Sequence, residues 1–205
     1  ARELTRNLNL GALPVPIKLV STETIGATLG ESALDKGVHA GLLGFAIVAL
    51  FMILWYRLPG VVAVVSLAIY VVLMLAVFKL VPVTLTAAGI AGFILSVGMA
   101  VDANILIFER LKEEMHKTAN MHEAMAHGFS RAGLSIRDSN LSSIISAVIL
   151  FWFGTSLIRG FALALALGVL VSMLTAITIT RTLLLSLGAT HVNRVNRFLF
   201  GSGIK

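Results

Sequence analysis

The sequence predicts an all-α integral membrane protein with five transmembrane helices and a short extramembrane N-terminal segment. Of its 205 residues, 58% are hydrophobic and 13% are charged, and the mean hydropathy is +0.96. Soluble domains carry about 25% charged residues, so this composition excludes an ordinary soluble domain. From Val83 to Phe108 the only ionisable residue is Asp102. At ~1.5 Å per residue, a helix of that length exceeds the ~30 Å hydrocarbon core of a bilayer.

Residues 1–36, before the first span, are expected to be the end of an extramembrane region and a linker into the membrane. Pro14 and Pro16 prevent a continuous helix there, whereas the partial alternation in residues 17–21 suits a short strand. An ordinary linker has a similar composition, so both interpretations stay open. Because the chain lacks an initiator Met and a signal-like start, we expect it to be a fragment of a longer polypeptide.

Turn and interface signals divide the apolar part of the chain into spans. Trp55 and Tyr56 are typical of a membrane–water interface. The following turn, residues 57–60, contains Pro and Gly, which stop one helix and let the chain reverse. Thr84 or Thr86 is a candidate N-cap for the third span. We expect a transmembrane domain over residues 37–187, with spans at 38–56, 61–78, 83–108, 139–158 and 160–180.

The only long connection between spans, residues 109–138, is charged and is expected to lie in water. Asn120 with Glu123 is typical of a capping box at the start of an amphipathic helix. Such a helix either rests on the bilayer surface or docks a partner. Ser135 with Asp138 offers a second cap, at the start of the fourth span.

Residue types that bind metals or perform covalent catalysis are absent or unsuitably spaced. Cys is absent, and spacings of six and five keep three histidines off a common helical face: His116, His122 and His127. An aspartyl protease needs two carboxylates that share a proton, but the spans contain only Asp102. A serine mechanism lacks a base, since only His39 lies near a span. We therefore expect no enzyme, no metal site and no catalytic residue.

Small residues line one face of the third span and one face of the fifth. Those of the third recur every three or four residues: Gly89, Gly92, Ser96, Ala100 and Ala103. Those of the fifth follow a four-residue period: Gly160, Ala164, Gly168, Ser172 and Ala176. Because such faces let helices approach closely, we expect helix packing at Gly89, Gly92, Gly160 and Gly168. Asp102 lies beside the first of these faces and is expected to be buried against protein.

Asp102 is the candidate functional residue, and its predicted role is proton relay. A carboxylate near the bilayer centre costs ~2.5 to 3.5 kcal/mol on insertion scales and usually marks an ion pathway or a proton relay. The alternative is a carboxylate that only hydrogen-bonds a neighbouring helix. The expected supporting polar residues are Ser96, Asn104, Asn140 and Ser143. The hydroxyl groups at the start of the fourth span either line a wet path toward Asp102 or bond back to their own helix.

The distribution of Lys and Arg predicts the orientation in the membrane. Ten of these residues fall on one side of the predicted spans and two, Lys79 and Arg159, on the other, once the N-terminal segment is set aside. The positive-inside rule then makes the loop 109–138 and the C-terminus cytoplasmic and the N-terminal segment periplasmic. Residues 188–205 form a basic tail suited to anionic headgroups. The formal charge of +6 thus needs no nucleic-acid partner.

One run of residues resembles a known family. Residues 98–110, Gly-Met-Ala-Val-Asp-Ala-Asn-Ile-Leu-Ile-Phe-Glu-Arg, resemble the signature of the SecD family of export proteins, in the RND (resistance-nodulation-division) superfamily. Arg-Gly-Phe-Ala at 159–162 is similar to the last span of that family, and Asp-Ser-Asn at 138–140 stands where the family usually has Asp-x-Asn. The sister family SecF usually carries an Asn-Asp pair in place of residues 102–104, so SecD is favoured. The resemblance covers about residues 10–181.

The resemblance implies an architecture and a function. The five spans would form most of a six-helix RND-type half, and residues 1–36 would end a periplasmic domain. The chain would be a subunit of a bacterial inner-membrane motor that the proton motive force drives, with protons as the coupling ion, no other cofactor, and Asp102 as the proton carrier. Implied partners are SecF, the SecYEG translocon, the unfolded preprotein, the lipid bilayer and, as a further candidate, YajC. The alternative is an RND-type small-molecule efflux or lipid exporter fragment.

Overall fold

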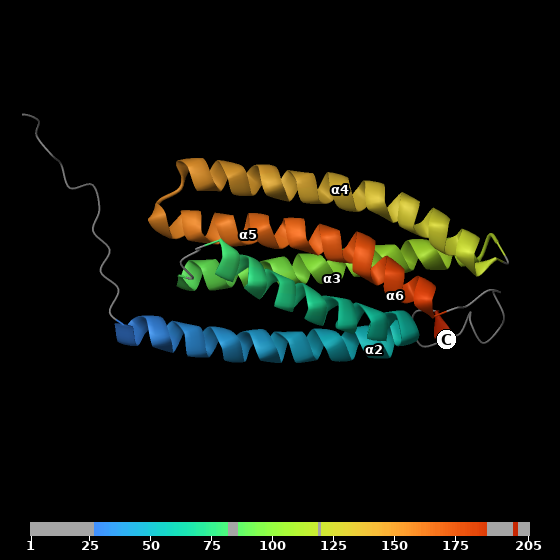
Figure 1. Cartoon of the computed structure of the whole chain (residues 1–205), viewed down its shortest axis with the longest axis horizontal. Helices are drawn as coiled ribbons and strands as arrows, with labels where there is room; N and C mark the ends of the chain where they lie inside the picture. The colour runs from blue at the N-terminus through green and yellow to red at the C-terminus, as the bar shows by residue number, and fades with distance from the viewer. Residues whose placement is uncertain (1–26, 82–85, 119, 188–198, 201–205) are drawn as a thin grey trace, which may run out of the picture.

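The computed structural model describes residues 27–81, 86–118, 120–187 and 199–200, and these form an elongated bundle of long helices (Figure 1). The elements in chain order are α2 (Ala27–Leu80), α3 (Ala87–Met115), α4 (Met121–Phe153), α5 (Ser156–Leu174), the π-helix η1 (Thr175–Thr180) and α6 (Arg181–Ser186). In this part of the chain four helices are long and apolar enough to cross a membrane. The predicted all-α membrane fold is confirmed. Predictions for residues 1–26 and for most of the tail lie outside the described residues.

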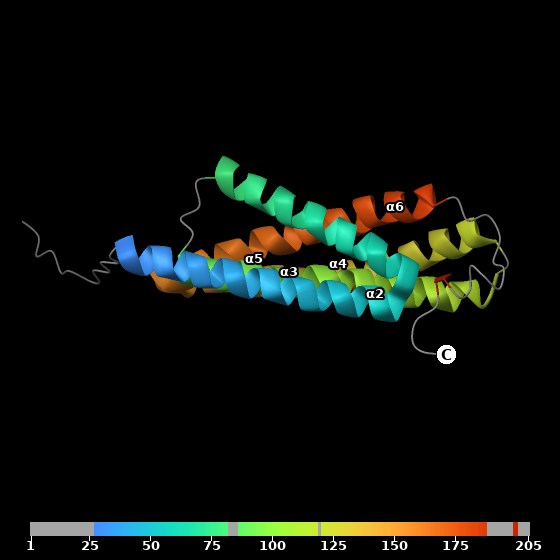
Figure 2. The same cartoon turned by 90° about the horizontal axis from the view of Figure 1, so that it is seen from below.

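The first of these four helices, α2, is folded back on itself at Arg57. Its 54 residues would extend about 80 Å if straight, far more than one membrane crossing needs. Arg57 has φ 53° and ψ −115°, and it is the only non-glycine residue with positive φ among those described. Figure 2 shows the two arms running back from this turn and diverging. The predicted turn at 57–60 is therefore present, and α2 supplies two of the five expected spans.

Close approach of the two arms at this turn requires a glycine. A Cβ at position 60 would collide with the carbonyl oxygen of Met52. Pro59, inside the turn, lacks an N–H group and cannot continue the hydrogen-bond ladder of a helix. Tyr56, expected at a membrane interface, is buried and stacks in a tilted contact on Phe108 of α3, with 5.6 Å between ring centroids.

The predicted cap of α3 is correct for Thr86, whose side chain accepts a 3.1 Å hydrogen bond from the Gly89 N–H. The alternative cap, Thr84, lies outside the described residues. The helix continues to Met115, beyond the predicted end of the third span at 108. Nothing in residues 109–115 interrupts a helix, and Arg110 pairs with Glu113 one turn further on at 2.9 Å.

The helix cap predicted at Ser135 and Asp138 is wrong. α4 is one continuous helix of 33 residues from Met121 to Phe153, so Ser135 and Asp138 lie inside it and cap nothing. No proline and no adjacent pair of glycines interrupts residues 121–153, and the isolated Gly128 and Gly133 are tolerated within a helix. Asn120 is the N-cap, as predicted, and its Oδ1 accepts from the His122 N–H. The connection between α3 and α4 is thus short, residues 116–120.

The turn between α4 and α5 occurs earlier than predicted, at Gly154 and Thr155. A Cβ at position 154 would collide with the Leu150 carbonyl, so glycine is required where the chain leaves α4. α5 begins at Ser156 and ends at Leu174, where it continues directly into the π-helical segment Thr175–Thr180. Sequence patterns did not predict this change from α-helix to π-helix, in which each backbone hydrogen bond spans one residue more.

The bundle is held by the predicted small-residue faces of α3 and α5, which pack on each other more extensively than any other pair of elements. A Cβ at Gly92 would lie 2.6 Å from the Phe161 carbonyl oxygen, and one at Gly160 would lie 2.9 Å from Thr86 Oγ1. A Cβ at Gly168 would overlap the Ser96 side chain. Gly92, Gly160 and Gly168 thus lie where α3 and α5 meet, and Gly89 is also buried.

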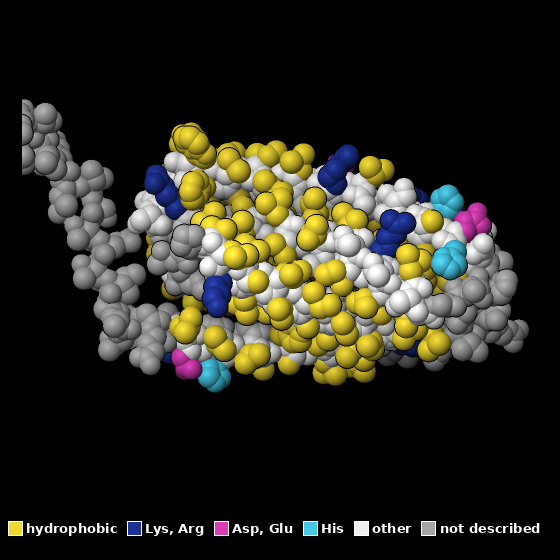
Figure 3. All heavy atoms as spheres, in the orientation of Figure 1, with side chains coloured by type: hydrophobic (Ala, Val, Ile, Leu, Met, Phe, Trp, Pro, Cys, Tyr) yellow, Lys and Arg dark blue, Asp and Glu magenta, His cyan; other side chains and the backbone are white. Residues whose placement is uncertain are grey.

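Large hydrophobic side chains remain exposed over much of the bundle. Figure 3 shows them covering the middle of one face, while acidic and histidine side chains lie toward its two ends. Leu54, Leu80 and Phe153 expose 69%, 82% and 88% of their surface. Such exposure is expected of helices whose solvent is the lipid hydrocarbon.

Candidate functional site

Asp102 lies on the surface of the bundle, which corrects the expectation that this chain buries it. The small-residue face of α3 turns toward α5, and its last members, Ala100 and Ala103, are buried. Residue 102 is rotated by about 100° from 103 and by about 200° from 100, so its side chain leaves the packed face. Among the described residues it has no hydrogen-bond or ion-pair partner.

Asp102 belongs to an otherwise apolar outer face of α3. We call this stripe the Asp102 face: Leu95, Met99, Asp102 and Leu106. Its spacing of four, three and four residues is that of one side of a helix, and Leu95 exposes 51% of its surface. A carboxylate on a lipid-facing stripe carries the full insertion penalty, ~2.5 to 3.5 kcal/mol or more. Cover by another protein element, or protonation of the carboxylate, would remove this cost.

A polar cluster lies inside the bundle, on the opposite side of α3. Asn104 is 3% exposed, and its Oδ1 accepts a 2.7 Å hydrogen bond from Thr180 Oγ1 of η1. Thr180 Oγ1 is also 2.8 Å from Ser66 Oγ of α2. A hydroxyl has one proton, so Thr180 donates to Asn104 and Ser66 donates to Thr180. This chain of bonds joins α2, α3 and η1 around the turn of α3 that carries Asp102.

A second polar contact lies two turns earlier on α3. The hydroxyls of Tyr70 and Ser96 are 2.7 Å apart. Ser96 Oγ donates its proton to the Phe93 carbonyl at 2.6 Å, so Tyr70 is the donor to Ser96. Both side chains are almost completely buried, and Gly168 of α5 lies directly against them. Ser96 is thus part of a closed internal contact between α2, α3 and α5.

Asn140 and Ser143, the two supporting residues predicted on α4, differ in their hydrogen bonding. Asn140 is 6% exposed, and its Nδ2 has no hydrogen-bond partner among the described residues. Ser143 bonds back to the Ser139 carbonyl at 3.4 Å, and Ser146 to the Ser142 carbonyl at 3.0 Å. Back-bonding therefore accounts for these two hydroxyls. Neither contacts Asp102 in this structure.

Charged side chains gather where α3 and α4 meet. Glu114, with 11% of its side chain exposed, pairs with Lys117 at 2.7 Å and with Arg131 at 2.6 Å. Arg131 also reaches Glu113 at 3.5 Å. These pairs fasten the end of the α3–α4 hairpin. In the described ranges no group of three His, Cys, Asp or Glu side chains is placed to hold a metal ion.

Three of the buried polar residues escaped the sequence analysis: Ser66, Tyr70 and Thr180. Each is a single hydroxyl in an apolar span, and most such hydroxyls bond back to their own helix, as Ser172 and Thr175 do here. Only Tyr70 carried a signal, because a phenol in the middle of a predicted span needs a hydrogen-bond partner when buried.

A bundle of apolar helices that hydrogen-bonds most of its described inner polar side chains but presents one carboxylate on its outer face defines a polytopic membrane protein with an intramembrane acidic site. Comparison with known families identifies the family of membrane proteins to which the chain belongs. Residues 10–190 match the family described as protein export membrane protein SecD/SecF, C-terminal, and the chain belongs to that family.

Individual relatives agree with this assignment. The chain is 54% identical over 207 residues to the protein translocase subunit SecD of Thermobaculum terrenum, covering 99% of this chain and 40% of the relative. It is 53% identical to SecD of Synechocystis over 185 residues, 90% of this chain and 39% of the relative. The chain thus spans about two fifths of these relatives, and it corresponds to their C-terminal portion.

A solved structure has the same fold. SecDF from Thermus thermophilus, described as a translocon-associated membrane protein, superposes with a TM-score of 0.82 and 34% sequence identity. The match covers 100% of this chain and 28% of that one. The predicted resemblance to SecD is confirmed by these comparisons.

Proposed function

We propose that this chain forms the proton-carrying membrane part of a protein-export motor that the proton motive force drives. The family supports the export role, since the relatives are named protein translocase subunits and the solved neighbour is described as translocon-associated. We propose SecF as the partner in the membrane and the SecYEG translocon, with YajC as a further candidate, as the associated machinery. The transported substrate is an unfolded preprotein, and the site is in the bacterial inner membrane.

The observation that carries the proposal is the exposure of Asp102 on an apolar stripe. A carboxylate there is tolerated if a partner helix covers it or if it is protonated. A partner that offers a polar or basic group can favour the charged form, and loss of that contact favours the neutral form. Protonation and contact are thereby coupled, so that each proton taken up or released shifts the packing of the Asp102 face between two arrangements.

The available energy is of the same order as the cost of such a cycle. One proton that crosses the membrane releases ~2.3 kcal/mol per 100 mV, which is comparable with the ~2.5 to 3.5 kcal/mol insertion penalty of a buried carboxylate. The internal cluster of Ser66, Asn104 and Thr180 fixes the opposite side of α3, so the change is directed to the outer face. We propose Asn104 and Ser96 as positioning residues, and we assign the proton itself to Asp102 alone.

The test replaces Asp102 by Asn, which keeps the size and most hydrogen bonds but cannot take up and release a proton. Inverted membrane vesicles that contain the full-length complex are assayed for preprotein translocation with and without a proton gradient. We expect normal abundance and assembly and no stimulation by the gradient. Asp102→Glu is expected to retain part of the stimulation.

The matched control is Glu109→Gln, which removes a carboxylate seven residues later on the same side of α3, in the charged last part of the helix. Gradient-dependent stimulation should persist in this variant. Stimulation of wild-type size in Asp102→Asn vesicles with normal protein levels would reject Asp102 as the proton carrier. Loss of stimulation in both variants would show that the effect is not specific to the intramembrane position.

A further inference from the structure

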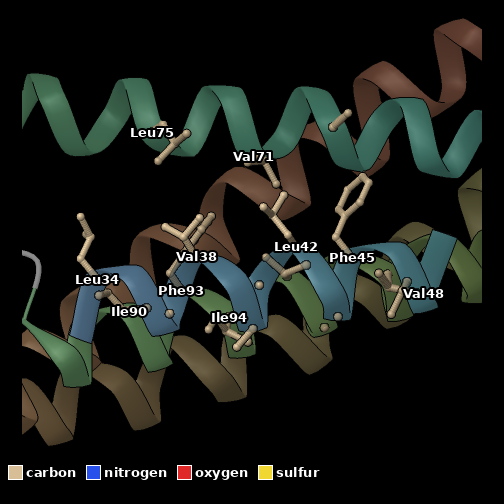
Figure 4. A pocket seen from close by; sticks show the side chains of 18 of the residues that line it. Leu34, Val38, Leu42, Phe45, Val48, Val71, Leu75, Ile90, Phe93 and Ile94 are labelled. Atoms are coloured by element: carbon tan, nitrogen blue, oxygen red, sulfur yellow. The ribbon is translucent and has the colours of Figure 1, made fainter. Parts of the chain in front are cut away.

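An elongated cavity of about 560 Å³ lies between the two arms of α2 and the neighbouring part of α3 (Figure 4). Its walls are almost entirely apolar. They include Leu34 and Phe45 from the first arm, Val71 and Leu75 from the second, and Phe93 and Ile94 from α3. No hydrogen-bond donor or acceptor of a side chain lines it. A polar solute, a peptide backbone or an ion would lose its hydration here without compensation.

The cavity does not extend along the whole length of α2. Along the first arm its lining runs from Leu34 to Val48, about 21 Å at 1.5 Å per residue. Beyond this, toward the turn at Arg57, the arms close on a buried core that includes Met52, Tyr56 and Leu67. A spanning partner helix needs a groove that crosses the whole ~30 Å hydrocarbon core. This cavity ends part of the way across, at about two thirds of that thickness.

Two glycines leave space on the floor of the cavity. A Cβ placed on Gly41 or Gly44 would meet no atom within 4 Å. These positions are therefore open among the described residues, in contrast to Gly92, Gly160 and Gly168, where a neighbouring helix fills the space. The free volume is enough for a flexible hydrocarbon chain, since ligand pockets of ~300 to 1,000 Å³ enclose ligands of that size.

Two lysines stand next to the end of the cavity that lies away from the turn at Arg57. Lys36 precedes the lining residue Gly37, and Lys79 follows the lining residue Phe78. They lie at matching distances from the turn, about 30 Å along each arm, so they mark the same membrane surface. Both are exposed. The nearby carboxylate of Asp35 is 3.4 Å from His39 Nδ1, and its backbone carbonyl accepts from the same ring nitrogen.

We propose that this cavity binds one acyl chain of an anionic phospholipid, with the phosphate between Lys36 and Lys79 and the tail between the arms of α2. The apolar lining, a length too short for a spanning helix and a cation on each arm beside the far end of the cavity each match that ligand. The tail ends beside Gly98 and Val101, the turn of α3 that precedes Asp102. A bound lipid therefore seals one side of the Asp102 region and wedges the two arms apart.

The experiment uses the full-length protein in vesicles of phosphatidylglycerol and phosphatidylethanolamine. The probe is phosphatidylglycerol with a photoreactive diazirine at the end of one acyl chain, and the labelled peptides are mapped by mass spectrometry. We expect saturable labelling around Phe45 and Val101, above the level of exposed positions such as Leu170. Unlabelled phosphatidylglycerol should compete for it.

Gly41→Phe fills the cavity with a ring that the open floor accommodates, and it is expected to abolish the saturable labelling. The matched control is Ala46→Phe, on the same arm but outside the cavity lining, which should label as wild type does. In Lys36→Gln/Lys79→Gln, the preference for phosphatidylglycerol over phosphatidylcholine should fall by about fivefold for each lysine, the contribution of one basic residue near an anionic surface.

Three results would overturn the proposal. Equal labelling of Gly41→Phe and wild type would show that the tail lies outside the cavity. Labelling that never saturates would show only bulk lipid around the helices. Protection of the cavity residues together with a cross-link to another polypeptide would show that a protein segment occupies the space. None of these outcomes depends on export activity, so the proposal stands or falls separately from the proton-relay function.

Discussion

Asp102 and Asn104 are separated by one residue, and the helix gives them opposite surroundings. Their directions differ by about 200°, so one faces outward and the other joins Thr180 and Ser66 inside the bundle. The buried amide also donates to the Ala100 carbonyl at 3.1 Å. The rotation of α3 is thus fixed by polar bonds on its inner side, and this keeps Asp102 on the outer face.

Thr180→Val tests that anchoring. The two side chains have nearly the same shape, so the change removes the hydroxyl that bonds Asn104 and Ser66 and leaves the packing. Side-chain hydrogen bonds inside membrane bundles contribute ~0.6 to 2 kcal/mol, and we expect the free energy of unfolding to fall by about that amount. The measurement is denaturant unfolding of the purified protein in detergent. Thr182→Val, an exposed neighbour that bonds only to the Thr178 carbonyl, should leave stability unchanged.

A fall of equal size in both threonine variants would contradict the anchoring role, because only Thr180 reaches another helix. A silent Thr180→Val would show that water or a rearranged Ser66 satisfies Asn104. The predicted order of stability is therefore wild type and Thr182→Val together, with Thr180→Val below them.

Sequence alone made Asp102 a candidate but did not predict its exposure, and the reason is physical. A lone carboxylate in an apolar span is conspicuous in any reading of hydropathy. Its exposure depends on where the neighbouring small-residue face ends and on which helices are present to cover the other side. The bonds of Thr180 were also beyond prediction, because the π-helical turn rotates it relative to the regular α-helical register of α5.

Among the elements, the α3–α5 pair shows how much of the helix packing can be predicted from the periodicity of the sequence. The four-residue spacing from Gly160 to Ala176 predicted a packing face, and the structure places Gly168 against Ser96 and Tyr70. The partner helix was not predictable from spacing, since small-residue faces are interchangeable. The continuous α4 was missed for a related reason: Ser135 and Asp138 are compatible with a cap, but no residue there forces the helix to stop.

Gly168→Ala is the sharpest test of this packing. The new methyl group would overlap the side chain of Ser96 and lie 3.0 Å from the Tyr70 hydroxyl oxygen, so we expect reduced accumulation in the membrane and lower thermal stability. Ser96→Gly in the same chain removes the obstructing side chain and should restore accumulation. Gly133→Ala is the control, because a Cβ there meets nothing within 4 Å.

Failure of Ser96→Gly to improve on Gly168→Ala would place the conflict elsewhere, in the Tyr70 hydroxyl or the backbone of α3. Normal accumulation of Gly168→Ala would show that α3 and α5 separate easily. Either result would weaken the conclusion that this pair is the rigid part of the bundle.

For the whole molecule, the cation distribution predicts the orientation in the membrane. The chain has no Cys, so single cysteines report sidedness without a background. We expect Lys117→Cys, in the α3–α4 turn, to react with a membrane-impermeant maleimide only from the cytoplasmic side. Val81→Cys, at the end of α2, should react only from the periplasmic side. The measurement compares intact spheroplasts with inverted vesicles, and the reverse pattern would refute the orientation.

The exposed carboxylate also leads to a prediction about assembly, namely whether a partner subunit covers the Asp102 face. Leu95 lies two turns before Asp102 on the Asp102 face and is half exposed, yet it does not line the lipid cavity. If a partner subunit covers this face, a benzophenone maleimide attached to Leu95→Cys should cross-link to a second polypeptide in native membranes. The control is Leu170→Cys on α5, which has similar exposure, 49%, and should react with lipid alone.

Cross-linking at Leu95 should also weaken in Asp102→Lys, because reversing the charge opposes any basic partner group. Equal cross-linking from both positions, or none from Leu95, would mean that the Asp102 face meets lipid and that its carboxylate is carried in the neutral form.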